Sequence, residues 1–153
     1  MAVVILGLMP LAESFQFEAK RIPLPLDSRV LLGSQDTDTP RDPPKHPSTS
    51  NGYIPSKRSA TKGGEPITPL CLSPSHAEAW LRGNQVIFRD LESPFGTFVN
   101  DKKLGVEEIS LKTGDIIRLG YQITRNQRTP SDITDDHLKP IIVKVTISVA
   151  SHY

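Results

Sequence analysis

Short apolar stretches separated by closely spaced turn residues dominate the chain from Leu70 onward. Apolar and polar residues alternate in the last of these stretches, residues 141–149. One face would carry Val143, Val145, Ile147 and Val149, and the other Lys144, Thr146 and Ser148. Alternation with a period of two is typical of strands, and strands this short and this closely spaced form antiparallel sandwiches or barrels. The sequence therefore predicts an all-β fold, most simply an antiparallel β-sandwich.

The N-terminal residues 2–11 are nearly all apolar, which is compatible with a signal peptide or with a buried strand. A signal peptide carries a basic segment before its apolar core, and this chain has none. Pro10 interrupts the stretch, which is also too short to span a bilayer as a helix. We therefore expect a strand over residues 3–8, no membrane segment, and an intracellular protein of the cytoplasm, the nucleus or both. Two prolines within residues 22–26 favour an edge strand or a loop there.

Composition changes at Ser34. Between Pro40 and Pro69 the chain carries seven of its 14 prolines, and no apolar periodicity remains. Such a segment has little apolar surface to offset the entropy lost on ordering. We expect one domain over residues 1–153, interrupted at 34–69 by a mobile insertion rich in proline and serine. Residues 51–54, Asn-Gly-Tyr-Ile, are expected to dock on the domain.

The composition excludes several functions. Eighteen basic and 17 acidic residues leave a net charge of +1, so a nucleic-acid partner is not expected. The single cysteine, Cys71, cannot form a disulfide framework and is best interpreted as a small buried apolar residue. The four histidines show no metal-ligand spacing. We found no nucleophile elbow or phosphate-binding loop, so we expect neither an enzyme nor a bound cofactor.

Three motifs in a fixed order carry a resemblance to a known family. They are SPSHA at residues 73–77, RDLESPFGTFVN at 89–100 and LKTGDIIRLG at 111–120. Together they resemble the forkhead-associated (FHA) domain of the SMAD/FHA superfamily. The residues after 113 look similar to FHA domains of sarcolemma-associated protein and its fungal relatives. The resemblance implies a β-sandwich that binds phosphothreonine peptides in signalling partners.

The resemblance also implies roles for individual residues. In the family, the hydroxyl corresponding to Ser73 donates to the phosphate, and the histidine corresponding to His76 supports the binding loops. We therefore expect the following residues at the phosphopeptide site: Ser73, Ser34, Ser75, Arg82, Ser93 and Phe95. Structural motif positions are expected at Gly33, His76, Asp90, Gly96, Thr97, Asn100, Gly114 and Asp115. Gly96 is expected in a tight loop that excludes a Cβ, and Asn100 before a two-residue turn. Trp80 is expected to pack on a sheet face or in the core.

Two positions depart from the family pattern. The arginine that pairs with the phosphate is replaced by Ser34, and a serine hydroxyl cannot supply the charge or the planar fork of a guanidinium. The asparagine that holds the peptide backbone is replaced by Phe95. Pro74 also removes a backbone N–H beside Ser73. Cations that would restore a phosphate site are Arg82 and, in the insertion, Arg41, Lys45, Lys57, Arg58 and Lys62.

Two hypotheses therefore remain open. The chain is either a phosphothreonine-binding module that uses Ser73 and relocated cations, or a phospho-independent adaptor on the same scaffold. The family resemblance favours the first and the two substitutions favour the second. In both cases the partner is a protein or a phosphopeptide, and the sequence does not indicate an oligomeric state.

Overall fold

Every regular element that the structure describes is a β-strand. The computed structural model describes residues 2–26, 28–36, 48–56, 59–60, 66–67, 72–125, 127 and 138–151. Its strands are β1 (Ala2–Pro10), β2 (Lys20–Pro23), β3 (Val30–Asp36), β4 (Tyr53–Ser56), β5 (Ser59–Ala60), β6 (Pro66–Ile67), β7 (Ala77–Arg82), β8 (Gln85–Asp90), β9 (Thr97–Val99), β10 (Lys102–Lys103), β11 (Ile109–Leu111), β12 (Ile116–Leu119) and β13 (Ile141–Ser151). The predicted all-β class is confirmed.

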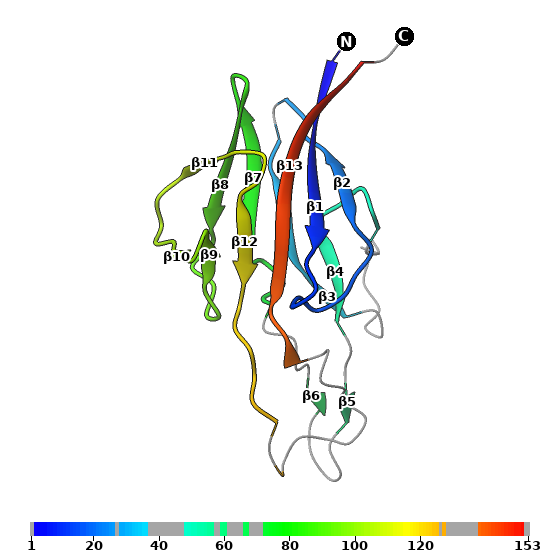
Figure 1. Ribbon diagram of the computed structural model, residues 1–153, viewed down its shortest axis with the longest axis vertical. Coiled ribbons are helices and arrows are strands. Elements are labelled where there is room, and N and C mark those ends of the chain that lie inside the picture. Colours follow the sequence, from blue (N-terminus) through cyan, green and yellow to red (C-terminus); the bar gives the residue numbers. More distant parts are fainter. Residues whose placement is uncertain are drawn as a thin grey trace.

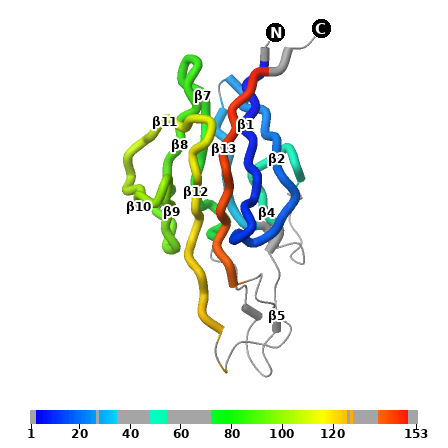
Figure 2. The backbone as a smooth tube through the Cα atoms, in the orientation of Figure 1, coloured from blue at the N-terminus to red at the C-terminus, as the bar shows by residue number. Residues whose placement is uncertain are grey.

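Two sheets face each other as a sandwich (Figure 1). The six-stranded sheet has the order β10-β9-β12-β13-β1-β2, and the five-stranded sheet has the order β11-β8-β7-β3-β4. Strands β5 and β6 form a separate pair. All pairs are antiparallel except β3 and β4, which run parallel. Strand β1 pairs with the last strand, β13, over its whole length, and Figure 2 shows β1 and β13 side by side.

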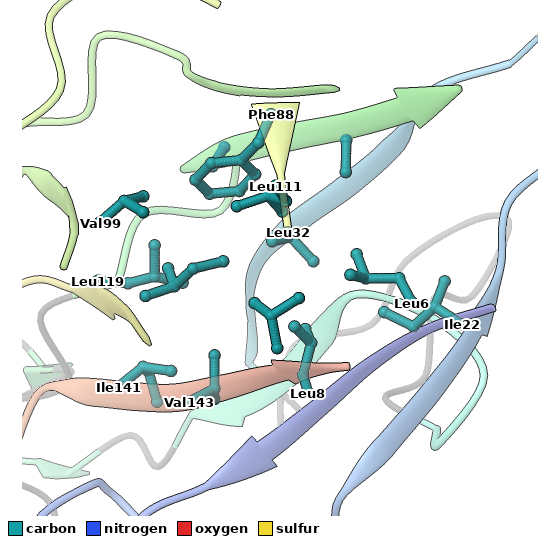
Figure 3. Packing of buried hydrophobic residues seen from close by; sticks show 14 of the residues in the cluster. Leu6, Leu8, Ile22, Leu32, Phe88, Val99, Leu111, Leu119, Ile141 and Val143 are labelled. Carbon is teal, nitrogen blue, oxygen red and sulfur yellow. The ribbon is translucent and has the colours of Figure 1, made fainter. Parts of the chain in front are cut away.

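The core lies between the inner faces of the two sheets (Figure 3). Leu6 and Leu8 of β1 face Phe88 of β8, and all three side chains are buried. On β13 the buried residues Val143 and Val145 alternate with exposed residues, as the sequence predicts. Fully burying an aliphatic or aromatic side chain contributes about 1.5–3 kcal/mol, so this inner layer dominates the stability of the fold.

The turns between strands place particular residues in left-handed backbone conformations. Asn100 and Asp101 have φ of 51° and 67° between β9 and β10, which is the twist that a two-residue antiparallel hairpin requires. Gly114 has φ of 99° in the turn before β12. The turn roles predicted for Asn100 and Gly114 are confirmed.

Part of the predicted insertion belongs to the sandwich. Residues 34–36 continue β3, and residues 53–56 form β4 beside it. Ile54 is buried in the core, which confirms the docking predicted for residues 51–54. The side chain of Lys20 helps to hold this segment, because its ammonium donates to the carbonyl oxygens of Ser48 and Tyr53. A boundary at residue 34 was wrong because composition does not show that a polar stretch contributes an edge strand.

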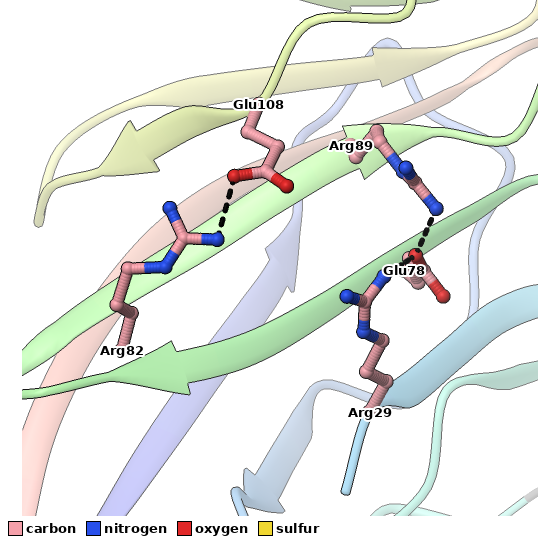
Figure 4. A network of polar contacts seen from close by, with 5 residues as sticks. All are labelled: Arg29, Glu78, Arg82, Arg89 and Glu108. Carbon is pink, nitrogen blue, oxygen red and sulfur yellow. Dashed lines mark hydrogen bonds and ion pairs between the residues drawn. The ribbon is translucent and has the colours of Figure 1, made fainter.

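The outer face of the five-stranded sheet is covered by paired charges (Figure 4). Glu78 accepts from Arg29 and from Arg89, and Arg82 pairs with Glu108. The guanidinium of Arg29 lies 4.0 Å from the centre of the Trp80 ring. Trp80 therefore packs on a sheet face, as expected, and only 7% of it is exposed because arginine side chains cover it.

Candidate functional site

Four segments of the chain, part of strand β3 and three loops, meet at one end of the sandwich. We call them the loop cluster: residues 33–34, 72–76, 91–96 and 120–123. The strand pairing brings them together, because Leu32, the last residue of β3 that pairs with β7, lies opposite Ala77 at the start of β7, and Ala77 pairs with Asp90 at the end of β8. Likewise Thr97 at the start of β9 pairs with Leu119 at the end of β12.

His76 joins three of these loops. Its backbone N–H donates to the Leu32 carbonyl of β3, and its ring contacts Ser73 of its own loop and Gly96 of the loop at 91–96. The N–H of Ser73 donates to Nδ1 at 3.1 Å, so Nδ1 is unprotonated, and the protonated Nε2 therefore donates to the Gly96 carbonyl at 2.9 Å. Burial lowers the pKa of His76, against smaller opposing effects of the Gly96 carbonyl and Asp90. His76 is a neutral structural residue, as the sequence analysis expected.

Asp90 organises the loop between β8 and β9. One carboxylate oxygen accepts from the hydroxyls of Ser93 and Thr97, each at 2.6 Å, and the other accepts from the Ser93 N–H at 3.1 Å. The Ser93 hydroxyl in turn accepts from the N–H of Gly96 at 3.1 Å. Hydrogen bonds to an ionised carboxylate are short and strong, so this loop is held in one shape. The hydroxyl of Ser93, expected at the ligand, is used inside the loop.

Glycine positions allow the loops to approach one another. Gly96 has φ of 87°, which L side chains rarely adopt. A Cβ on Gly33 would lie 2.0 Å from the carbonyl oxygen of Pro74, so strand β3 touches the loop at 72–76 at this point. Glu92 also has a positive φ, 55°, which the sequence analysis did not anticipate because glutamate gives no signal for that conformation.

Ser34 points into the protein. Only 7% of the residue is exposed, and its hydroxyl donates to the carbonyl of Leu72 at 2.7 Å. Its backbone N–H donates to the carbonyl of Ser73. Ser34 therefore positions the loop that carries Ser73. The short hydroxyl finds its partner in the adjacent loop, and contact between Ser34 and a ligand stays a prediction.

The surface of the loop cluster presents hydroxyls and an aromatic pair. Ser73 is half-buried and Ser75 is exposed, and within the described part of the chain neither hydroxyl has a hydrogen-bond partner. The ring of Phe95 lies 6.2 Å from that of Tyr121, tilted by 59°. Tyr121 is 52% exposed. Sequence reasoning missed Tyr121, although it directly follows the Leu-Gly pair that ends the third motif.

Arg82 does not belong to the loop cluster. It ends β7, whereas His76 precedes the start of that strand. A strand rises about 3.3 Å per residue, so Arg82 lies about 17 Å along the strand from Ala77. The expectation that Arg82 lies near Ser73 was wrong. The two residues are close in sequence, but the extended strand β7 separates them in space. Cys71 and the five cations expected from the insertion lie outside the described residues.

The described residues include no evident metal site and no helix that could span a membrane. No group of three or more histidine, cysteine or acidic side chains is arranged to hold a metal ion within the ranges given above. In the same ranges, no helix is long and apolar enough to cross a membrane.

The structure belongs to the class of two-sheet β-sandwiches and has an ordered loop cluster at one end. More particularly, residues 67–120 match the family model of the FHA domain. That segment contains all three motifs, and the sandwich has the FHA fold. No curated protein matches the chain.

Two solved structures with TM-scores above 0.5 support the fold. An engineered FHA domain with a Myc-pTBD peptide has a TM-score of 0.54 at 12% identity, covering 95% of this chain and 92% of that chain. The yeast Pml1 splicing factor has a TM-score of 0.51 at 16% identity, covering 95% and 80%. A structure from an analysis of phosphothreonine-dependent FHA domain interactions has a TM-score of 0.46 at 19% identity, covering 99% and 98%. Identities this low show the fold alone.

Proposed function

We propose that this chain is an interaction module, not an enzyme, that binds phosphothreonine peptides at the loop cluster. The observation that carries the proposal is the state of Ser73. Its backbone N–H and carbonyl are held by His76 and Ser34, while its half-buried hydroxyl has no partner among the described residues. The Ser73 hydroxyl is available to donate a hydrogen bond to a phosphate oxygen. Because the backbone of Ser73 is already held in place, binding requires little further ordering of this loop.

The FHA match supports the same proposal. Ser73 and His76 occupy the Ser-x-x-His positions of the motif within the matched segment. One solved structure of the same fold carries a Myc-pTBD peptide. Phosphate recognition by FHA domains is a known mode of peptide binding in which charged hydrogen bonds supply the affinity.

Ser34 and Phe95 replace the arginine and the asparagine of the family pattern, and we expect phosphate binding at this site to be weak for that reason. No arginine or lysine lies in the described loops of the cluster, residues 33–34, 72–76, 91–96 and 120–123. Hydrogen bonds from charged donors are about twice as strong as those between neutral groups. A site that relies on serine hydroxyls and backbone N–H groups should therefore bind a phosphate less tightly than one with an arginine.

Binding of a degenerate phosphothreonine library, compared with its unphosphorylated twin by fluorescence anisotropy, tests the proposal. We expect the phosphorylated library to bind more tightly. Ser73→Ala should weaken that binding by about tenfold, the effect of one hydrogen bond to a charged group. Ser110→Ala is the matched control, since Ser110 is exposed on β11 of the five-stranded sheet, outside the loop cluster. Equal affinity for the two libraries would refute the proposal.

A phospho-independent adaptor is the second candidate, and the aromatic pair favours it. Phe95 and Tyr121 place apolar surface where the family pattern has a polar asparagine. Aromatic side chains are frequent anchors in protein interfaces. If this function holds, Phe95→Ala should weaken binding of an unphosphorylated partner, and Ser73→Ala should leave that binding unchanged.

A further inference from the structure

Cations on the outer faces of the two sheets have different surroundings. On the five-stranded sheet Arg29, Arg82 and Arg89 each pair with a glutamate. On the six-stranded sheet, no carboxylate of the described residues pairs with Lys103 or Arg118. A cation without a local counter-charge attracts an anion from outside the chain more strongly than a neutralised one.

The strand register places these two cations in one row. Phe98 of β9 pairs with Lys103 of β10 on one side and with Arg118 of β12 on the other. Directly opposite residues in an antiparallel pair project from the same face of the sheet. Val99, the neighbour of Phe98, is buried in the core, so this row lies on the outer face.

Packing on Phe98 holds the guanidinium of Arg118 in a defined orientation. The centre of the guanidinium lies 4.2 Å from the centre of the Phe98 ring. Its Nε is buried and has no hydrogen-bond partner among the described residues. Stacking uses one face of the planar group, and because Nε is buried, a bidentate contact with an anion would use the two terminal nitrogens, Nη1 and Nη2.

This row lies directly beside the loop cluster. A Cβ placed on Gly96 would be 3.3 Å from Cε1 of Phe98 and 3.7 Å from Cε of Lys103. On the other side, Arg118 is two residues from Gly120, whose N–H donates to the Gly96 carbonyl at 2.9 Å. The flank of Gly96 is therefore bounded by Lys103, Phe98 and Arg118.

We propose that Lys103 and Arg118 form an anion-binding subsite that takes a phosphate or carboxylate group of a peptide bound at the loop cluster. The inference rests on the proposed function and extends it. It specifies that the bound peptide carries an anionic group beside Gly96, at the row formed by Lys103 of β10, Phe98 of β9 and Arg118 of β12. The described residues of the loop cluster include no cation, and Lys103 and Arg118 supply positive charge beside Gly96. The ligand class is a peptide that is anionic at this flank.

Inorganic phosphate tests the subsite without any peptide. In an NMR titration, phosphate is expected to shift the Nε–H resonance of Arg118, and Lys103→Gln should reduce that shift severalfold. Lys102→Gln is the matched control, because Lys102 is the adjacent lysine of β10, pairs with the buried Val99 and projects to the opposite side. An Arg118 resonance that does not move, or that responds equally in the two variants, overturns the inference.

Peptides then identify the source of the anion. Two phosphothreonine peptides are compared, one neutral elsewhere and one with added glutamates on either side of the phosphothreonine. Lys103→Gln should weaken binding by about five- to tenfold relative to Lys102→Gln. A loss for both peptides assigns the phosphate to the subsite, and a loss for the glutamate peptide alone assigns a carboxylate. Equal affinities of the two variants for both peptides overturn the inference.

The two proposals fail in different ways. If phosphate shifts Arg118 in a manner that requires Lys103, but no peptide binds in a manner that depends on Ser73, the subsite stands and the proposed function is wrong. If peptide binding requires Ser73 but is equal in the Lys103 and Lys102 variants, the function stands and the subsite is wrong. The fluorescence of the single tryptophan, Trp80, monitors unfolding in each variant and shows that it is folded.

Discussion

Replacing Asp90 with alanine should destabilise the fold more than any single change at an exposed carboxylate. Asp90 is 8% exposed and accepts three hydrogen bonds from Ser93 and Thr97. The hydroxyl of Thr97 is fully buried and has no access to water. Leaving a buried donor unpaired costs about 1–3 kcal/mol, and the partly buried Ser93 adds a smaller amount. We therefore expect the free energy of unfolding to fall by about 3 kcal/mol.

Urea denaturation monitored by Trp80 fluorescence measures this loss. For m of about 2 kcal/mol per M, the midpoint should shift by about 1.5 M. Asp115→Ala is the matched control, because Asp115 also accepts from a backbone N–H and a side chain, but in an exposed turn. Its expected loss is about 1 kcal/mol.

A double-mutant cycle isolates the cause. Thr97→Val removes the buried donor, so Asp90→Ala should cost less in the Thr97→Val background than in the unmodified chain. The expected difference is at least about 1 kcal/mol, the size of interaction found between directly contacting residues. A midpoint shift for Asp90→Ala no larger than that for Asp115→Ala, or strict additivity with Thr97→Val, would refute this account of the loop.

Three further predictions concern pH and backbone packing. Burial lowers the pKa of His76 below its ordinary 6.5, so the unfolded chain binds the proton at a higher pH than the folded chain does. The free energy of unfolding should therefore fall as pH drops below about 6.5. Urea midpoints measured from pH 8 to pH 5 test this, and His76→Gln should lack this component. Burial also lowers the pKa of Lys20 from 10.5 to about 8, against a raising effect of Glu18. The free energy of unfolding should therefore gain a favourable contribution as pH rises from about 8 to 10.5, and Lys20→Met should lack it. Gly33→Ala should unfold or severely destabilise the chain because its Cβ would meet the Pro74 carbonyl, whereas Gly114→Ala, with open space but a positive φ, should lose only about 1 kcal/mol by thermal denaturation.

Sequence alone gave a sound account of whatever depends on local chemistry. The alternation along β13 identified the face that carries the buried Val143 and Val145, since side chains of a strand point to opposite sides, although Val149 on the same face is exposed. Asn100 and Gly114 were recognised as turn residues because backbone preference is a property of the residue itself. The three motifs identified the FHA pattern, and the family match includes all of them.

Tertiary structure alone decided how those elements meet. The inward turn of Ser34 depends on the Leu72 carbonyl, which strand pairing places beside it. Arg82 is remote from Ser73 because β7 lies between them, and Lys103 and Arg118 share a row only through the register of β9 with its two neighbours. Pairing and register are relations between segments distant in the chain, so no local pattern encodes which side chains they bring together. The sequence therefore determined the strands, the turns and the family pattern, while pairing and packing determined which hydroxyls and cations face a ligand.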